Sequence, residues 1–334
     1  KWFISGLAVI STLVLARLLT PEDFGIVAMA SIVIGLLYGL SEFGVEAFLI
    51  RGTDLNKKYY DTAWTLNIIQ HTIIAILLVL LSPFAATYFN DTRITPVINL
   101  LAIGAFIQGF QNIGIVFFRK ELNFKKDFRF NITKRILLFA VTLGLAFELK
   151  NYWALAISNV VGSFLGVLIS FFVHAYRPRL SFYKLKNMLR FSIYAMALNI
   201  GKFINNRLDV IVMGGMTSTS HLGTYNIASE LSAMATKEVV VPVGRGLFPN
   251  FSKLSDQPKK LKEAFLYSLS VIAILCFPLG IGLWTVAEDF VLVVLGYQWL
   301  KAIPLIKWLV IYGTLSSLID VMNGSIMIVT NHER

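Results

Sequence analysis

The chain has 334 residues, of which 56% are hydrophobic and only 15% are charged, and its formal net charge is +11. Soluble globular proteins carry about 25% charged residues. This composition therefore excludes an ordinary cytosolic enzyme, a disordered chain and a secreted disulfide scaffold, and the single cysteine, Cys276, cannot pair within the chain. Repeated apolar runs of about 20 residues instead predict an all-α, polytopic membrane protein.

Ten apolar runs are long enough to cross a hydrocarbon core of about 30 Å as helices. Their residues do not alternate between polar and apolar types, as the strands of a membrane barrel would. The chain begins with Lys1 directly before the first run, so we expect a piece of a longer membrane protein. The runs are residues 2–19, 25–48, 63–82, 95–118, 133–149, 153–175, 191–216, 222–248, 264–285 and 302–330.

Lys and Arg residues concentrate in alternate loops, at residues 51–61, 119–135, 177–190 and 250–263. Positive residues mark the cytoplasmic side of a membrane protein, so these loops and the N-terminus are predicted to lie in the cytoplasm. Because the basic excess is confined to short loops beside the membrane, no nucleic-acid partner is expected. The other loops hold only Arg17, Arg93, Lys150 and Lys301.

The chain also contains an internal repeat. Residues 24–31 (FGIVAMAS) open the second run and residues 222–229 (LGTYNIAS) open the eighth, with Gly, Ala and Ser at matching positions. An even number of runs separates the two segments, so the two units have the same orientation in the membrane. Parallel repeats of this kind are typical of transporters. The first unit is predicted to cover residues 1–176, and the second, residues 177–334, to hold only four helices.

Polar residues recur at helical spacing inside three of the runs, forming stripes on single helix faces. Ionisable groups at membrane depth usually face a bundle interior or a water-filled cavity. We interpret the stripes as a polar cavity whose lysines attract an anionic substrate and whose carboxylates bind protons or a metal cation. Interhelical hydrogen bonds that only hold the bundle together are the alternative. The stripes comprise Asn199, Lys202, Asn206 and Asp209, flanked by Asn205; Asn226, Glu230 and Lys237; and Tyr38, Glu42 and Glu46.

Enzymatic chemistry has no recognisable motif in this sequence. The four histidines are far apart, and none stands at metal-ligand spacing from Cys, Asp or Glu. Neither a glycine-rich phosphate loop nor a nucleophile elbow is present. We therefore expect no catalytic residue, no cofactor and no metal.

Residues 16–25 read ARLLTPEDFG, the most specific of several short motifs. This segment resembles one in the Wzx-like polysaccharide exporters of the multidrug/oligosaccharidyl-lipid/polysaccharide (MOP) superfamily. The resemblance looks closest to the colanic-acid and teichuronic-acid exporter branch. Further matches follow in order at residues 208–209, 222–228, 294–299 and 302–305.

The resemblance implies two six-helix lobes, the second incomplete here, and transfer of an undecaprenyl-diphosphate-linked oligosaccharide to the outer face of the bacterial cytoplasmic membrane by alternating access. Lys202 and Lys237 would then attract the diphosphate, Asn199, Asn205 and Asn206 would bind polar head-group atoms, and Asp209, Glu230, Glu42 or Glu46 would carry a coupling H⁺ or Na⁺. Membrane lipids and polysaccharide polymerase or assembly proteins are the implied partners. A multidrug or cation antiporter, a membrane glycosyl transferase and a non-transporting assembly component remain as alternatives.

Overall fold

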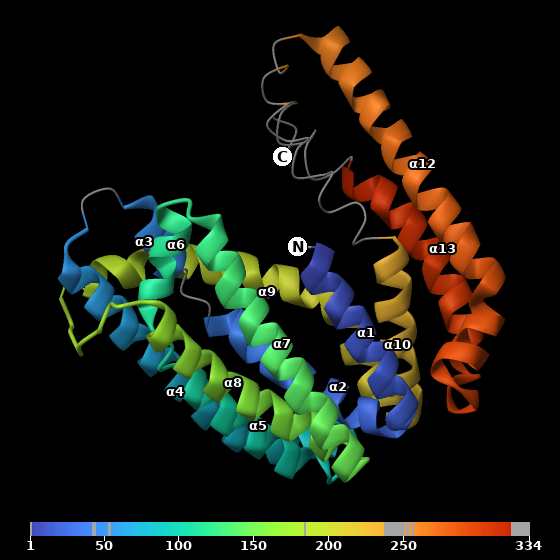
Figure 1. Ribbon diagram of the computed structural model, residues 1–334, viewed down its shortest axis with the longest axis horizontal. Coiled ribbons are helices and arrows are strands. Elements are labelled where there is room, and N and C mark those ends of the chain that lie inside the picture. Colours follow the sequence, from blue (N-terminus) through green and yellow to red (C-terminus); the bar gives the residue numbers. More distant parts are fainter. Residues whose placement is uncertain are drawn as a thin grey trace. The chain divides into compact units, whose positions relative to one another are not determined.

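The computed structural model describes residues 2–41, 45–52, 55–183, 185–236, 251, 254 and 257–321. Within these ranges every regular element is a helix (Figure 1), which confirms the predicted all-α fold. The chain divides into two compact units, Lys1–Gly223 and Thr224–Arg334. The lobe boundary at residue 176 stays a prediction.

Five helices of the described part are long and apolar enough to cross a membrane: Pro21–Gly39, Lys57–Tyr88, Trp153–Val173, Lys259–Leu295 and Ala302–Ile319. A sixth span results if the bent pair Ile94–Gln108 and Ile113–Lys120 is counted as one. These helices confirm a polytopic membrane protein. The count of ten spans stays a prediction.

Neighbouring helices pack lengthwise in the first unit. Helix α4 packs along α5, α5 along α8 and α8 along α7, while α9 packs against α2 and α1 against α7 (Figure 1). The helices of this unit are α1 (Trp2–Leu18), α2 (Pro21–Ser41), α3 (Val45–Arg51), α4 (Lys57–Tyr88), α5 (Ile94–Gln108), the 3₁₀-helix η1 (Ile113–Ile115), α6 (Val116–Lys120), α7 (Phe124–Leu149), α8 (Trp153–Val173), α9 (Leu185–Met216) and the first turn of α10 (Thr219–Ala235).

Residues 20–23 (TPED) explain why α2 begins where it does. The backbone N–H of Thr20 donates to Asp23 Oδ2 at 2.9 Å, and the N–H of Asp23 donates to Thr20 Oγ1 at 3.3 Å. This reciprocal arrangement is a capping box, and Pro21 suits the first helical position because its missing N–H is not needed there. Asp23 Oδ1 also accepts from the N–H of Tyr152 at 2.9 Å, so the same carboxylate ties α2 to the start of α8.

A hydrophobic cluster holds α3 against the first turns of α4. Tyr60 stacks on Phe117, with ring centroids 4.4 Å apart. Burial of such side chains contributes about 1.5–3 kcal/mol each, so the cluster fixes the short helices around the cavity described below. Its buried members are Leu49, Tyr60, Ala63, Leu66, Ile113, Val116 and Met188.

The second unit contains the remainder of α10, α12 (Pro258–Phe290), the π-helix η2 (Val291–Leu295), the 3₁₀-helix η3 (Tyr297–Trp299) and α13 (Ala302–Val321). Helix α12 packs along α13. The chain turns between them at Gly296, whose φ of 104° is strained for any residue with a Cβ. The turn carries Trp299 into the core, where its side chain is fully buried.

Candidate functional site

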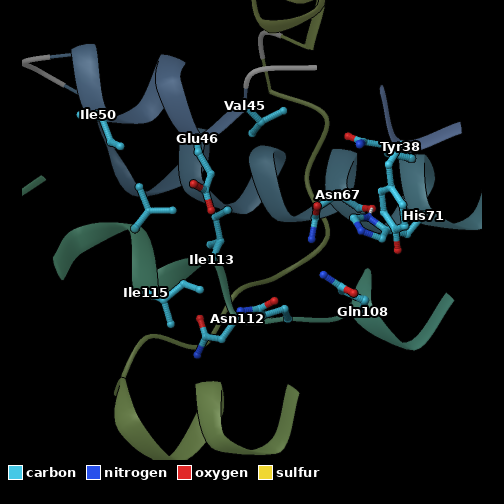
Figure 2. A pocket seen from close by; sticks show the side chains of 13 residues that line it. Tyr38, Val45, Glu46, Ile50, Asn67, His71, Gln108, Asn112, Ile113 and Ile115 are labelled. Carbon is cyan, nitrogen blue, oxygen red and sulfur yellow. Dashed lines mark hydrogen bonds between the residues drawn. The ribbon is translucent and has the colours of Figure 1, made fainter. Parts of the chain in front are cut away.

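A cavity of about 540 Å³ lies within the first unit, between α2, α3, α4, α5 and η1 (Figure 2). Its lining combines aliphatic side chains with an unusual number of carboxamides. In Figure 2 the side chains of Asn67 and Gln108 point toward one another across the space, from α4 and from the end of α5. The polar lining residues are Tyr38, Glu46, Asn67, Gln70, His71, Gln108, Gln111 and Asn112.

The cavity lies where a membrane helix is broken. Residues 95–118 were predicted as one span, but α5 ends at Gln108 and the chain resumes at η1 and α6 with a bend of 67°. One local and one long-range contact accompany the break. Asn112 is extended (φ −64°, ψ 117°) and its side chain accepts from Gly114 N. Its own N–H donates to Ser170 Oγ of α8 at 2.9 Å. Irregular backbone at membrane depth is tolerated where it lines a cavity or is buried in protein.

Close packing of α4 on the break positions the amides on the cavity wall. Asn67 Nδ2 donates to the carbonyl of Gly109 at 3.1 Å, and a Cβ at Gly109 would come within 2.8 Å of His71 Cβ. His71 Nδ1 lies 2.8 Å from the carbonyl oxygen of Asn67. Because a carbonyl only accepts, Nδ1 is the donor in this bond, which leaves Nε2 as an acceptor on the neutral ring. The Tyr38 ring meets His71 edge-on, with centroids 5.7 Å apart.

The charge at the cavity edge is balanced. Glu46 accepts from Arg119 Nη1 at 2.7 Å, and Arg119 Nε also donates to Asp127 at 3.2 Å. Glu46 is half exposed, at 50% of its side chain, so water screens this pair and its contribution to stability is small. Of the lining residues that the structure describes, Glu46 alone is charged.

Hydrogen bonds hold the segment after α8, called the strap below, against the start of α4 beside the cavity. Tyr176 Oη donates to Asp61 Oδ1 at 2.7 Å, and the N–H of Arg179 donates to the same oxygen at 3.0 Å. Asn112 Nδ2 donates to the carbonyl of Tyr176 at 2.7 Å, which joins the strap to the helix break. Burial, together with the neighbouring Asp61 carboxylate, raises the pKa of Tyr176 above its ordinary value.

A second polar cluster ties together the starts of α2, α5 and α10. Arg93 donates to Glu22 at 2.6 Å and to Asp91 Oδ2 at 2.7 Å, and Thr219 Oγ1 donates to the same Asp91 oxygen at 3.0 Å. The hydrogen bonds from Arg93 hold the pKa of Asp91 below its usual value, against the raising effect of burial. The charge network therefore links segments far apart in the sequence.

Of the site residues predicted from the sequence, Glu46 lines the cavity, together with Tyr38 of the same predicted stripe. Asn205, Asn206 and Asp209 are exposed on α9, and Glu230 is half-buried on α10. None of these four lines the cavity. Asn199 and Lys202 belong to α9, and the placement of their side chains lies outside the description. Glu42 and Lys237 lie outside the described residues.

Sequence reasoning missed the amides, although a signal was present. Asn67, Gln70 and His71 stand at spacings of three and one in an otherwise apolar run, which places them on one side of a helix. The stripes predicted from the sequence all contain charged residues, whereas this group of side chains carries only amides and a histidine. Gln108, Gln111 and Asn112 escaped because the break that brings them together was not anticipated.

The sequence profile of the polysaccharide biosynthesis protein family matches residues 14–304 of this chain. Among individual relatives, the lipopolysaccharide biosynthesis protein WzxC of Escherichia coli is 27% identical over 94% of this chain and 65% of its own length. The succinoglycan biosynthesis transport protein ExoT of Rhizobium meliloti is 25% identical over 90% of this chain and 61% of its own. The chain thus spans somewhat less than two thirds of the length of these curated relatives.

A solved structure of the lipid II flippase MurJ, in an inward closed conformation, has the same fold. The TM-score is 0.71, and the match covers 99% of this chain and 78% of MurJ. Sequence identity is only 14%, so this likeness concerns the fold alone. The family profile confirms the polysaccharide-related family that the motifs indicated, and the solved structure confirms the helical fold.

Proposed function

Because the chain belongs to the polysaccharide biosynthesis protein family, we propose that it acts as a membrane flippase. Its substrate is an undecaprenyl-diphosphate-linked oligosaccharide, carried from the cytoplasmic to the outer face of the bacterial cytoplasmic membrane. The single observation that supports this most is the family match over residues 14–304 on a fold shared with a lipid flippase. In this proposal the protein is a transporter and not an enzyme, and the basic loops favour an N-terminus in the cytoplasm.

The cavity supports transport better than catalysis. It is a polar space inside a unit of membrane-spanning helices, and it adjoins a broken helix. Discontinuous helices at membrane depth commonly build substrate sites in secondary transporters. Among the described residues, no group of three or more His, Cys, Asp or Glu is placed to hold a metal ion. A polar wall that binds and releases a head group is the role that this geometry suits.

Individual roles follow from charge. Lys202 and Lys237 attract the diphosphate, since cationic side chains form the strongest hydrogen bonds with phosphate oxygens. Asn199, Asn205 and Asn206 bind polar atoms of the head group. A coupling H⁺ or Na⁺ is carried by a carboxylate, for which Asp209, Glu230, Glu42 and Glu46 are the candidates. Cation exchange at Glu46 requires its ion pair with Arg119 to open.

Alternating access requires a contact that forms in one state and breaks in another. The cluster of Arg93, Asp91 and Thr219 is suited to this task, because a single turn of α10 supplies the hydroxyl that Asp91 accepts. We assign to it the role of a latch on the outer side of the membrane. Its release accompanies opening toward that side.

The proposed function is tested by deleting the complete gene in its host and measuring lipid-linked oligosaccharide on each face of the cytoplasmic membrane. Accumulation on the cytoplasmic face with loss of surface polysaccharide is the expected result. Unchanged lipid-linked pools with altered sensitivity to cationic drugs would instead identify a multidrug exporter. Loss of surface polysaccharide with normal flipping would identify a non-transporting component of the assembly machinery.

A further inference from the structure

Part of the cavity wall is polar and has no hydrogen-bond partner among the residues that the structure describes. Gln70 is only 8% exposed and lines the cavity, yet its carboxamide makes no hydrogen bond to any residue that the structure describes. The side chains of Gln108, Gln111 and Tyr38 also line the cavity and likewise make none within the described ranges. These four groups contrast with Asn67 and Asn112, whose amides are bonded to backbone atoms.

A carboxamide that has no partner among the described residues and is nine-tenths buried beside a half-open cavity, as that of Gln70 is, requires an explanation. Burying such a group without a hydrogen bond is unfavourable, so buried polar groups are almost always paired. The cavity, at about 540 Å³, lies within the range of about 300–1,000 Å³ typical of small-ligand sites. The helix break and the close approach at Gly109 hold the amides in place. The wall therefore has the properties of a preformed site with free hydrogen-bonding capacity.

The chemistry of the wall selects an uncharged ligand rich in hydroxyl groups. A carboxamide both donates and accepts hydrogen bonds, and so does a hydroxyl. A diphosphate only accepts, and it calls for cations. Among the described lining residues only Glu46 is charged, and its carboxylate is already paired with Arg119. None of these described residues would offset the charge of a phosphate, whereas a sugar ring would find donors and acceptors on several sides.

We propose that this cavity, built from Gln70, Gln108, Gln111 and Tyr38, holds an uncharged sugar residue of the lipid-linked oligosaccharide and leaves the diphosphate outside. The assignment rests on the proposed function. It makes the first unit a subsite for the glycan that is separate from the lysines proposed to attract the diphosphate. Specificity for the glycan then depends on uncharged side chains at the helix break.

The test uses the purified full-length protein and three probes. These are the host's undecaprenyl-diphosphate-linked oligosaccharide, undecaprenyl diphosphate without sugar, and the free oligosaccharide released from the lipid. The main variant is Q70M/Q108M, which removes both carboxamides while preserving side-chain length. A second variant, Q111M, alters a less buried position. The matched control is N159L, which removes an exposed amide of α8 that does not line the cavity.

Wild type and N159L should bind the glycosylated lipid more tightly than the bare lipid. In Q70M/Q108M this preference should fall by about tenfold or more, as expected for lost hydrogen bonds to a buried ligand, with unchanged affinity for the bare lipid. Because these carboxamides have no hydrogen-bond partner in the described part of the chain, the melting temperature should not decrease. A preference that survives in both Q70M/Q108M and Q111M would overturn the proposal.

The free oligosaccharide separates the two proposals. If neither lipid binds but the free oligosaccharide binds and loses affinity in Q70M/Q108M, the glycan site stands and the flippase proposal fails. If both lipids bind equally and the free oligosaccharide does not bind, the flippase proposal survives and the glycan site is refuted. Equal loss of affinity for both lipids in the variant would also refute it, because that result would show general damage to the fold.

Discussion

Gly25 of α2 and Gly223 of α10 are packed so closely that neither position has room for a side chain. A Cβ at Gly25 would lie 1.9 Å from the carbonyl oxygen of Thr219, and a Cβ at Gly223 would lie 1.8 Å from the carbonyl oxygen of Pro21. Each glycine thus abuts the residue four positions before the other. The two glycines occupy equivalent places in the repeated segments 24–31 and 222–229. The contact is therefore symmetric, as a crossing of two repeat-related helices should be.

Replacing Gly223 with alanine should destabilise this crossing. The added methyl group meets backbone atoms of Pro21 and Gly25, which cannot move away as a flexible side chain could, and overpacking of this kind costs about 1–3 kcal/mol. We expect a lower melting temperature for the purified protein and reduced transport. The matched control is Gly144→Ala in α7, where the new Cβ has no neighbour within 4 Å. If both variants melted at the same temperature, the contact would carry no energetic weight.

The Arg93 cluster should make the stability of the folded protein depend on pH in the acidic range. Because hydrogen bonds from Arg93 lower the pKa of Asp91 below its ordinary 3.8, the ionised form contributes stability that is fully present above about pH 4. This stability is lost as the pH falls through the lower folded-state pKa. Asp91→Asn should decrease the melting temperature at pH 7 and should weaken the fall of the melting temperature below about pH 4.

The control for this titration is Asp289→Asn, which alters an exposed carboxylate at the end of α12. It should leave the melting curve at pH 7 and the acid dependence as in the wild type. An Asp91→Asn protein with unaltered acid dependence would show that other carboxylates dominate the transition.

The bond from Tyr176 to Asp61 should stabilise the strap beside the cavity. Tyr176→Phe removes a hydrogen bond of 2.7 Å to a carboxylate, and bonds to charged groups contribute about 1.5–3 kcal/mol. A double-mutant cycle with Asp61→Asn, followed by denaturant unfolding, measures the coupling between the two side chains. Tyr297→Phe, at a position 80% exposed, should have almost no effect. Additive effects of Tyr176→Phe and Asp61→Asn would argue against the bond.

The proposed role of the lysines is tested by Lys202→Ala, Lys237→Ala and the double substitution. If they attract the diphosphate, each single variant should transport less lipid-linked oligosaccharide, and the double variant almost none, with normal insertion into the membrane. Each charge-assisted hydrogen bond lost corresponds to about 1.5–3 kcal/mol, or roughly tenfold or more in affinity. Full transport by the double variant would exclude this role. Lys202→Arg, which keeps the charge, should retain activity.

The motif TPED is an example of local structure that follows from local sequence. Thr20 and Asp23 form the capping box that their spacing suggests, because both partners of the interaction lie within one turn. The helical character of the apolar runs follows in the same way, since a backbone in lipid must satisfy its hydrogen bonds internally. The repeat is visible in the sequence, but the contact between its two copies is not. Only the folded chain brings Gly25 against the residues that precede Gly223.

The cavity could not be derived from the sequence. Its wall combines α4 with the broken end of α5, and the break depends on a hydrogen bond from the Asn112 N–H to Ser170 of α8. Because Ser170 is distant from Asn112 in the sequence, no local sequence pattern predicts that bond. The amides of Gln70 and Gln108 likewise form a candidate site only because the fold brings both to the wall of one cavity. A rule that favoured charged stripes identified Glu46, whose charge turned out to be balanced by Arg119.

The sequence by itself determined that this protein is an all-helical membrane protein with motifs of the polysaccharide biosynthesis protein family, because hydrophobicity and short motifs are local properties of the chain. Only the tertiary structure decided where the fourth predicted span breaks, which amides face a common cavity and which two glycines meet. These features arise from contacts between segments far apart in the chain. The free energy of such contacts depends on the distance and orientation of both partners, and neither quantity is encoded in a single stretch of sequence.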